Sequence, residues 1–249
     1  MLHSRELLQT LKIPNYANLT CDSLGLDSQE HCYNIEHFKK HNVRYHFNEL
    51  GYRTVPVDQF VGNEILALGD SFTLGLGVNY NHTWPAQLGK MINYPVLNFS
   101  LNGASNNWIA RKTQQLLTWF TPRAIVVHYT FTHRRERAEP NWSDDERTEC
   151  DPYYSDAENL QDWHIAFEYF NGLSIPVVHS FITDWHPNDI DYSILGTNVI
   201  PPVKKIDLAR DSFHYGPKTN RALAEKLTAF YLAYDINLTH HDTLVVPIA

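Results

Sequence analysis

Three side chains in two short motifs have the types and spacing needed to activate a serine hydroxyl. Ser71 lies in Gly69-Asp70-Ser71-Phe72-Thr73, directly after an apolar run, and Asp211 and His214 lie in the later motif Asp211-Ser212-Phe213-His214. A serine hydroxyl is a weak nucleophile until an imidazole accepts its proton, and that imidazole needs an acceptor that fixes its tautomer. We therefore interpret Ser71 as a nucleophile, His214 as its base and Asp211 as the acceptor, and we expect a loop or first helical turn that folds Asp211 back onto His214.

The elements that position these side chains follow from the apolar pattern. Short apolar runs predict buried strands over 65–68, 95–100, 124–130 and 175–181. Helices are predicted after Thr83 and after Ser105, which can serve as N-caps, over 160–171 before Gly172, and over 223–234. This alternation predicts the α/β class, with a parallel sheet covered by helices on both faces.

Parallel sheets bind ligands outside the carboxyl ends of their strands. Ser71 follows the first predicted strand, Gly103 the second, and Thr130 and His133 the third. Asp184 and His186 follow the fourth strand and are a rival acid and base. We favour Asp211 and His214, because the helix that begins near Pro217 would fix their loop, and we interpret the rival pair as a polar rim.

The two motifs resemble blocks of the GDSL or SGNH hydrolase family, which begins with a Gly-Asp-Ser turn and ends with Asp-x-x-His. The resemblance spans roughly residues 61–235, and the strand context and the order of the motifs make it more specific than a lone Gly-Asp-Ser. It implies an SGNH-type fold, which is a three-layer α/β/α fold around a flavodoxin-like parallel sheet, and a catalytic set made of Ser71, Asp211 and His214. The segment Asn48–Arg53 also resembles a stretch found ahead of the nucleophile block in some members.

Of the family's two middle blocks, the second has a similar stretch in this sequence and the third does not. Residues 98–106 resemble the second block, which implies that the Gly103 N–H holds the oxyanion together with the Ser71 N–H. The third block departs from the family pattern, because residues 127–136 contain no asparagine. Thr130 lies nearest the asparagine position and is our candidate third donor; without one, the transition state loses about 2 to 4 kcal/mol of stabilisation.

Residues beside these motifs are candidates for substrate binding: Asp70, Asn102, His133, Arg134, Trp185 and Tyr215. Arg134, Arg135 and Arg137 form the one basic cluster, which Glu136 and Glu139 interrupt. A solvated loop or helix start is the favoured interpretation, and an anion-binding role stays open because the cluster follows a core strand.

Composition limits the classes of function and the organisation of the chain. A length of 249 residues supports one substantial core, and a net charge of −8 argues against nucleic-acid binding. We expect an N-terminal extension (1–60) packed on a core domain (61–235), a lid or else a disordered loop at 131–156, and a tail (236–249). Three cysteines and the absence of a signal peptide or membrane span suggest a cytoplasmic protein. No metal motif is visible, so we expect no metal and no cofactor.

Three functions fit this pattern. The first is a serine hydrolase that cleaves short-chain acyl esters or O-acetylated carbohydrate through an acyl-serine intermediate. The second is an acyltransferase that uses the same residues, since only the acceptor differs. The third is a binding or structural module that has lost turnover with the third-block asparagine. Substrate identity and oligomeric state stay open.

Overall fold

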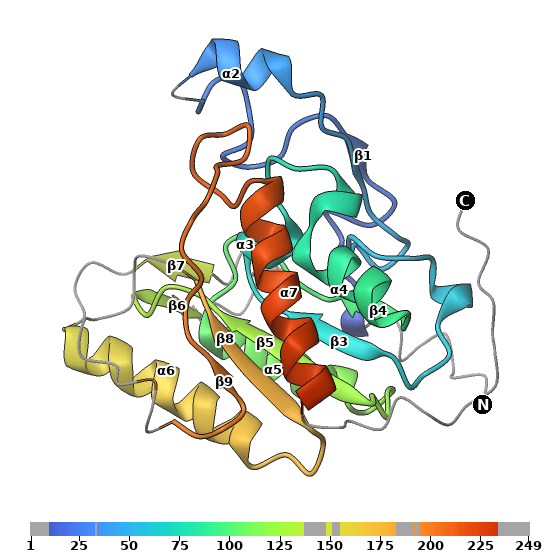
Figure 1. Ribbon diagram of the computed structural model, residues 1–249, viewed down its shortest axis with the longest axis vertical. Coiled ribbons are helices and arrows are strands. Elements are labelled where there is room, and N and C mark those ends of the chain that lie inside the picture. The colour runs from blue at the N-terminus through green and yellow to red at the C-terminus, as the bar shows by residue number, and fades with distance from the viewer. Residues whose placement is uncertain are drawn as a thin grey trace.

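A five-stranded parallel sheet forms the centre of the protein in the computed structural model, which describes residues 10–32, 34–136, 148–150, 155–182, 192 and 195–233 (Figure 1). Its strands are β3 (Ile65–Leu68), β4 (Val96–Asn98), β5 (Ala124–Tyr129), β8 (Val177–Phe181) and β9 (Val199–Ile200). They lie in the order β4-β3-β5-β8-β9, and each neighbouring pair is parallel. Numbered along the sheet-forming part of the chain, this is the order 2-1-3-4-5, which confirms the predicted flavodoxin-like sheet.

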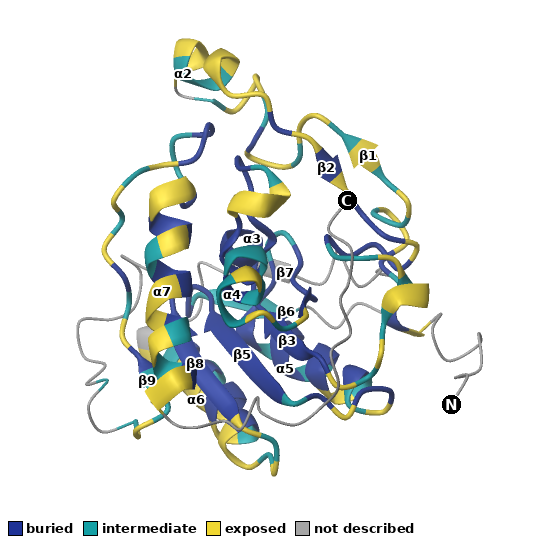
Figure 2. Ribbon diagram, turned by 45° about the vertical axis from the view of Figure 1, so that its right-hand side comes forward, coloured by how far each residue is buried: buried dark blue, intermediate teal, exposed yellow. Residues whose placement is uncertain are grey.

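Helices cover both faces of this sheet. Helices α4 (Trp84–Ile92) and α7 (Pro217–Ala233) lie over one face, and α5 (Asn106–Leu116) and α6 (Asp156–Asn171) over the other (Figure 1). Successive strand residues point to opposite faces: Ile65 belongs to the core cluster under α4 and α7, and Leu66 to the cluster under α5 and α6. Figure 2 shows the strands buried between these layers. The three-layer prediction is therefore confirmed.

The predicted helix starts are also present. The Thr83 side chain accepts from the Ala86 N–H, and the Ser105 side chain accepts from the Trp108 N–H, which satisfies donors of the first turn in α4 and α5. Ser155 and Glu158 form a reciprocal capping box at the start of α6. Strand β9 was not predicted, because a two-residue strand leaves too short an apolar run to recognise.

The N-terminal residues pack against this core. Strands β1 (Thr20–Cys21) and β2 (Tyr45–His46) form an antiparallel pair, and the short helix α2 (Ile35–Lys40) lies between them in sequence. Leu11, Ile13, Leu50 and Tyr52 belong to the same core cluster as the strand residues under α5 and α6.

Short elements complete the described chain. The 3-10 helices η1 (Val57–Gln59) and η2 (Tyr80–His82) lie in loops, and β6 (Arg134–Glu136) pairs antiparallel with β7 (Thr148–Cys150). The predicted lid at 131–156 falls largely outside the described residues, and the predicted tail at 236–249 falls wholly outside them. No helix in the described ranges has the length and hydropathy needed to cross a membrane.

Candidate active site

Ser71 is the first residue of the four-residue helix α3 (Ser71–Leu74), which follows β3 after a two-residue turn. Asp70 is the N-cap, and its Oδ1 accepts from the Phe72 N–H at 2.9 Å. Gly69 is required in this turn, because a Cβ there would lie 2.1 Å from Thr73 Oγ1 and 3.0 Å from the His128 carbonyl oxygen. The turn thus fixes Ser71 at the carboxyl end of a central strand.

His214 bridges Ser71 and Asp211. Its Nε2 lies 2.8 Å from Ser71 Oγ, and its Nδ1 lies 2.5 Å from Asp211 Oδ2. Each of the three residues is at most 2% exposed. This is the arrangement that transfers a proton from a serine hydroxyl to an imidazole whose other nitrogen is held by a carboxylate.

The loop that carries Asp211 and His214 is closed by local hydrogen bonds. The Ala209 N–H donates to the His214 carbonyl at 2.9 Å, and the Ser212 N–H donates to the Ala209 carbonyl at 2.9 Å. Ser212 adopts a left-handed conformation with φ of 64°, which turns the chain between the two side chains. The structure thus has the loop expected from the spacing, and α7 begins three residues after His214.

The environment of Asp211 favours its charged form. Burial alone raises the pKa of this carboxyl, but the hydrogen bond and charge of His214 and the N–H groups of Phe213 and His214 outweigh burial and hold the pKa below its ordinary value. Asp211 Oδ1 accepts from both N–H groups at 3.0 Å, which leaves Oδ2 for the imidazole. The carboxylate is therefore charged and oriented at neutral pH.

Two backbone N–H groups are available for a developing negative charge. Within the described residues, neither the Ser71 N–H nor the Gly103 N–H donates a hydrogen bond. Gly103 has φ of 79°, a conformation that favours glycine. Ser71 follows β3 and Gly103 follows β4, and because these neighbouring strands are parallel, both residues come after carboxyl ends on the same side of the sheet.

The Thr130 hydroxyl is engaged elsewhere. It donates to Asp70 Oδ2 at 2.6 Å and accepts from Arg134 Nη1 at 3.0 Å. A hydroxyl has one proton, so in this geometry Thr130 has none left for an oxyanion. Asn106 was missed in the sequence and contacts the same residue: its side chain accepts from the Thr130 N–H at 3.0 Å and donates to the Thr130 carbonyl at 3.2 Å.

Asp70 and Arg134 form a buried ion pair beside the nucleophile. Arg134 Nη1 lies 2.7 Å from Asp70 Oδ2, and the Asp70 side chain is fully buried. The Asp70 carboxylate thus accepts from three donors, namely Phe72, Thr130 and Arg134. Asp70 therefore positions the helix start and the guanidinium together.

The remaining residues predicted to bind substrate lie in different surroundings. Tyr215 is buried, with its ring 4.8 Å from that of Phe72 and part of the core under α4 and α7. The Asn102 side chain lies against Gly25, where a Cβ would be 2.5 Å from Nδ2. The His133 ring stacks on Phe131, and burial and the Arg134 charge lower its pKa. Trp185 and the rival pair Asp184 and His186 lie outside the described residues.

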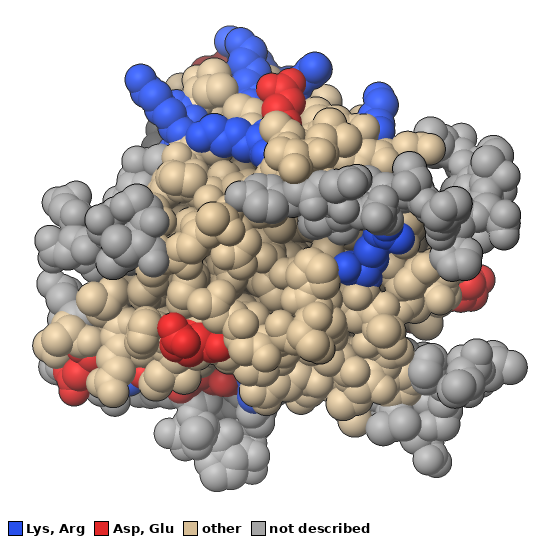
Figure 3. Space-filling view, turned by 60° about the horizontal axis from the view of Figure 1, so that its bottom comes forward, with Lys and Arg blue, Asp and Glu red and all other residues tan. Residues whose placement is uncertain are grey.

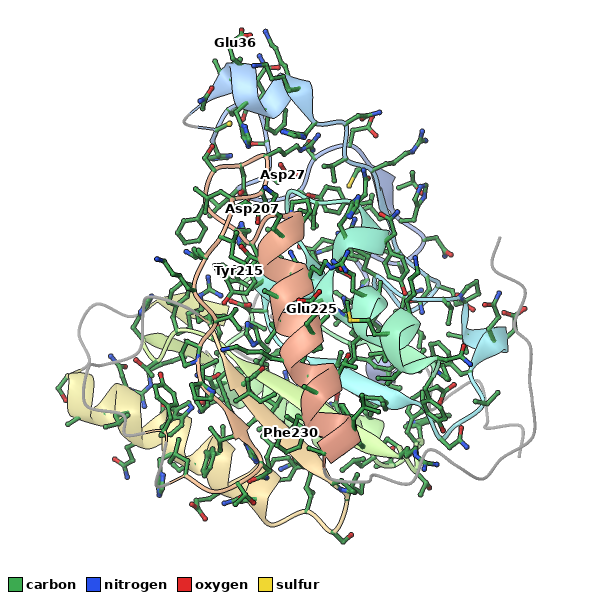
Figure 4. All side chains as sticks on the ribbon, in the orientation of Figure 1. Asp27, Glu36, Asp207, Tyr215, Glu225 and Phe230 are labelled. Carbon is green, nitrogen blue, oxygen red and sulfur yellow. The ribbon has the colours of Figure 1, made fainter. Side chains whose placement is uncertain are left out.

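A buried charge cluster ties the N-terminal segment to the Asp211 loop. Arg210 donates from Nε to Asp27 Oδ1 at 2.7 Å and from Nη2 to Asp27 Oδ2 at 2.8 Å. The Tyr45 hydroxyl also donates to Asp27 and accepts from the Gly77 N–H at 2.8 Å. Figure 4 places Asp27 near the N-terminal end of α7, close to the labelled Asp207. No local pattern points to this contact, because Asp27 and Arg210 are 183 residues apart.

Arg53 supports the other side of the site. Its guanidinium is buried and donates to the carbonyl oxygens of Leu74, the last residue of α3, and of Gly75 and Val78 in the loop that follows. The end of the nucleophile helix and the Asp211 loop are thus both bound by side chains from the first 53 residues.

The described residues bear on three other kinds of site: a metal site, a second hollow and a basic surface. No group of three His, Cys, Asp or Glu side chains suited to a metal ion occurs in the part of the chain that the structure describes. A hollow of about 450 Å³ is lined by Phe170, Pro176, Val177 and Asn198 among others, at the opposite end of β8. On the face in Figure 3, Lys and Arg side chains do not merge into a broad basic surface.

The fold and the site together define a class: an α/β protein with the 2-1-3-4-5 strand order and a Ser-His-Asp arrangement at the carboxyl ends of its strands. No protein-family model and no curated protein matches this chain. The resemblance to GDSL or SGNH blocks therefore stays a prediction from the residues that carry it.

Solved structures with a similar arrangement include esterases. An acetyl xylan esterase from Butyrivibrio proteoclasticus matches over 72% of this chain at 15% identity and a TM-score of 0.48, and the match spans 65% of that enzyme's length. A protein from Desulfitobacterium hafniense, described as lipolytic and of the G-D-S-L family, matches 68% of this chain and 99% of its own at 13% identity and a TM-score of 0.46. The esterase EstA from Pseudoalteromonas matches 70% of this chain and 100% of its own at 14% identity and a TM-score of 0.45.

Proposed function

We propose that this protein is a serine hydrolase that cleaves carboxylic esters through an acyl-serine intermediate. One observation carries the proposal: His214 lies between Ser71 Oγ at 2.8 Å and Asp211 Oδ2 at 2.5 Å. A buried carboxylate that holds one imidazole nitrogen while the other faces a serine hydroxyl is the minimal apparatus for nucleophilic acyl transfer.

The proposed reaction uses these groups twice. Ser71 Oγ attacks the ester carbonyl carbon while His214 Nε2 accepts the hydroxyl proton, and the Ser71 and Gly103 N–H groups donate to the carbonyl oxygen as it becomes negative. The intermediate collapses, the alcohol leaves with the proton from His214, and the acyl group stays on Ser71. Water then attacks the acyl-serine with His214 as base, which releases the acid and restores the hydroxyl. Asp211 holds the Nδ1 proton throughout and stabilises the imidazolium.

Burial of the site supports this chemistry. Ser71, Asp211 and His214 are almost fully shielded from bulk water, and interactions between charges are stronger where water is excluded. Short-chain acyl esters and O-acetylated carbohydrates are the substrate classes we propose to test first.

The test is labelling with a fluorophosphonate, which needs an activated serine but little substrate recognition. We expect one adduct on Ser71, identified by intact mass and peptide mapping, and its loss in Ser71→Ala and His214→Ala. A matched control exists in the same fold: Ser180 Oγ lies 2.8 Å from His128 Nδ1, and both residues are buried in the sheet.

The Ser180 hydroxyl donates to the Val127 carbonyl at 3.3 Å, so its proton is bound to the backbone of the sheet. We therefore expect Ser180→Ala to label normally. Labelling of Ser180, or no labelling of Ser71 in the folded protein, would contradict the proposal and favour a module without turnover.

A further inference from the structure

Two cationic side chains lie over aromatic rings close to the Ser71–His214 pair. Lys205 lies over two rings that contact His214, and Arg134 lies over a ring one contact further away. The Phe72 ring lies 4.6 Å from the His214 ring and 6.1 Å from the Phe131 ring. The Arg134 guanidinium carbon lies 4.7 Å from the Phe131 centroid, and Lys205 Nζ lies 5.5 Å from the Phe72 centroid and 5.2 Å from that of Phe213. The Asp70 carboxylate balances the Arg134 charge, and Lys205 adds a further positive charge over the Phe72 ring.

The Arg134 guanidinium is held in place by hydrogen bonds from one of its three nitrogen atoms. Both of its hydrogen bonds, to Asp70 Oδ2 and to Thr130 Oγ1, come from Nη1. Within the described residues, Nη2 and Nε have no acceptor, although the side chain is only 14% exposed. A guanidinium presents two parallel N–H groups that match the two oxygens of a carboxylate, so the unused edge is suited to that group.

The role of Asp70 is compatible with an anionic ligand. Asp70 is already satisfied by three donors, so it fixes Arg134 while leaving the Nε and Nη2 edge open. Fixing a flexible side chain in advance reduces the entropy lost when a ligand binds. Lys205 adds a second positive charge on the aromatic rings next to the nucleophile.

We propose that this site takes esters that carry a carboxylate in their acyl or alcohol part, and that Arg134, assisted by Lys205, binds that carboxylate. The proposal rests on the proposed hydrolase function and narrows its substrate class. It also gives a role to the basic cluster after the third core strand, for which the sequence left two interpretations open.

The test compares charged esters with neutral partners of the same shape. One pair places the carboxylate on the leaving group, 4-acetoxybenzoate against 4-acetoxybenzamide. The other places it on the acyl group, the mono(4-methylumbelliferyl) ester of adipic acid against its methyl ester. In the unaltered protein we expect kcat/KM for the charged member of at least one pair to exceed that for its neutral partner by about tenfold or more. A hydrogen bond between charged groups is strong enough to change binding by about this factor.

Variants assign the preference to its residues. Arg134→Gln should bring the ratio of the two kcat/KM values close to one, Arg134→Lys should restore part of it, and Lys205→Gln should lower it. The exposed neighbour Lys204 is the matched control, and Lys204→Gln should keep the ratio within a factor of about two. A salt titration should reduce the ratio as charges are screened.

The outcomes separate this proposal from the function on which it rests. If neutral esters are cleaved as well as charged ones, or if Arg134→Gln leaves the ratio unchanged, the carboxylate site is refuted while the hydrolase stands. If Ser71 is labelled but no test ester turns over, protection of Ser71 from the fluorophosphonate decides: 4-hydroxybenzoate must slow labelling and 4-hydroxybenzamide must not. If Ser71 is never labelled, both proposals fail.

Discussion

Replacing Asp27 with alanine should leave the Arg210 guanidinium buried without its counter-ion. Asp27 is fully buried and Arg210 is 5% exposed, so water cannot replace the lost carboxylate without opening the structure. Removing one partner of a buried pair costs about 3 to 5 kcal/mol. We expect the free energy of unfolding of Asp27→Ala to fall by that amount, a large share of the roughly 5 to 15 kcal/mol that stabilises a typical domain.

Urea denaturation followed by fluorescence measures this loss, and a second variant tests its cause. Asp27→Ala combined with Arg210→Met removes the stranded charge, so the double variant should be more stable than Asp27→Ala alone. The control is Asp22→Ala, whose side chain is 78% exposed and 4.0 Å from Arg44, and which should change stability by less than about 0.5 kcal/mol.

Arg210 also precedes Asp211, so the perturbation should reach the site. The rate at which the fluorophosphonate labels Ser71 should fall in Asp27→Ala under conditions where the variant is folded. A loss below about 1 kcal/mol, or a double variant no more stable than the single one, would refute the argument that this pair is a buried and mutually dependent unit.

Three further perturbations test other parts of the fold. Burial lowers the pKa of His179 from 6.5 to about 4, so between these pH values the unfolded chain binds more protons than the folded one. The free energy of unfolding therefore decreases by up to about 3 kcal/mol as the pH is lowered from above 6.5 to about 4. The free energy of unfolding, measured by urea denaturation, should therefore change less between pH 7 and pH 4.5 in His179→Gln than in the unaltered protein. The same change in both proteins would contradict the assignment of this pH dependence to His179. Gly77→Ala should cost about 1 to 3 kcal/mol and slow Ser71 labelling, because φ is 73° and a Cβ would lie 2.6 Å from Ala209 Cβ. Gly62→Ala is the control for backbone strain alone, because φ is 93° there and an added Cβ would have no neighbouring atom within 4 Å. Equal losses of stability in the two variants would show that crowding against Ala209 does not contribute to the effect of Gly77→Ala. Ser155→Ala should cost about 1 kcal/mol in thermal denaturation because it removes the cap of α6, and an unchanged melting temperature would contradict that.

The sequence predicted the parts of the fold that depend on local pattern. The runs that became β3, β4, β5 and β8 are apolar and short, and the caps at Thr83 and Ser105 mark helix starts, because a helix start needs a side-chain acceptor for its free N–H groups. The alternation of strands and helices predicted a parallel sheet covered on both faces, and the flavodoxin-like type of that sheet came from the family resemblance.

The parts that could not be predicted depend on contacts between distant segments. Nothing near Asp27 indicates that its partner is Arg210, and nothing near Thr130 indicates that its hydroxyl bonds to Asp70 and its backbone to Asn106. Tyr215 was expected beside substrate because it follows His214, yet the direction of its side chain is set by the packing of α7 on the sheet. Position in the chain locates a residue near an edge, whereas the surrounding side chains decide what it contacts.

The ties between the first 53 residues and the site have a consequence for synthesis. Arg53 can bind the end of α3 early, but Asp27 must wait for Arg210, which is made 183 residues later. At roughly 5 to 20 residues per second, that interval is about ten to forty seconds on the ribosome. During it Asp27 lacks the guanidinium that pairs with it in the folded protein. We therefore expect a nascent chain that stops short of Arg210 to be more open to proteases near its N-terminal segment than the full chain, until α7 and the loop before it emerge together.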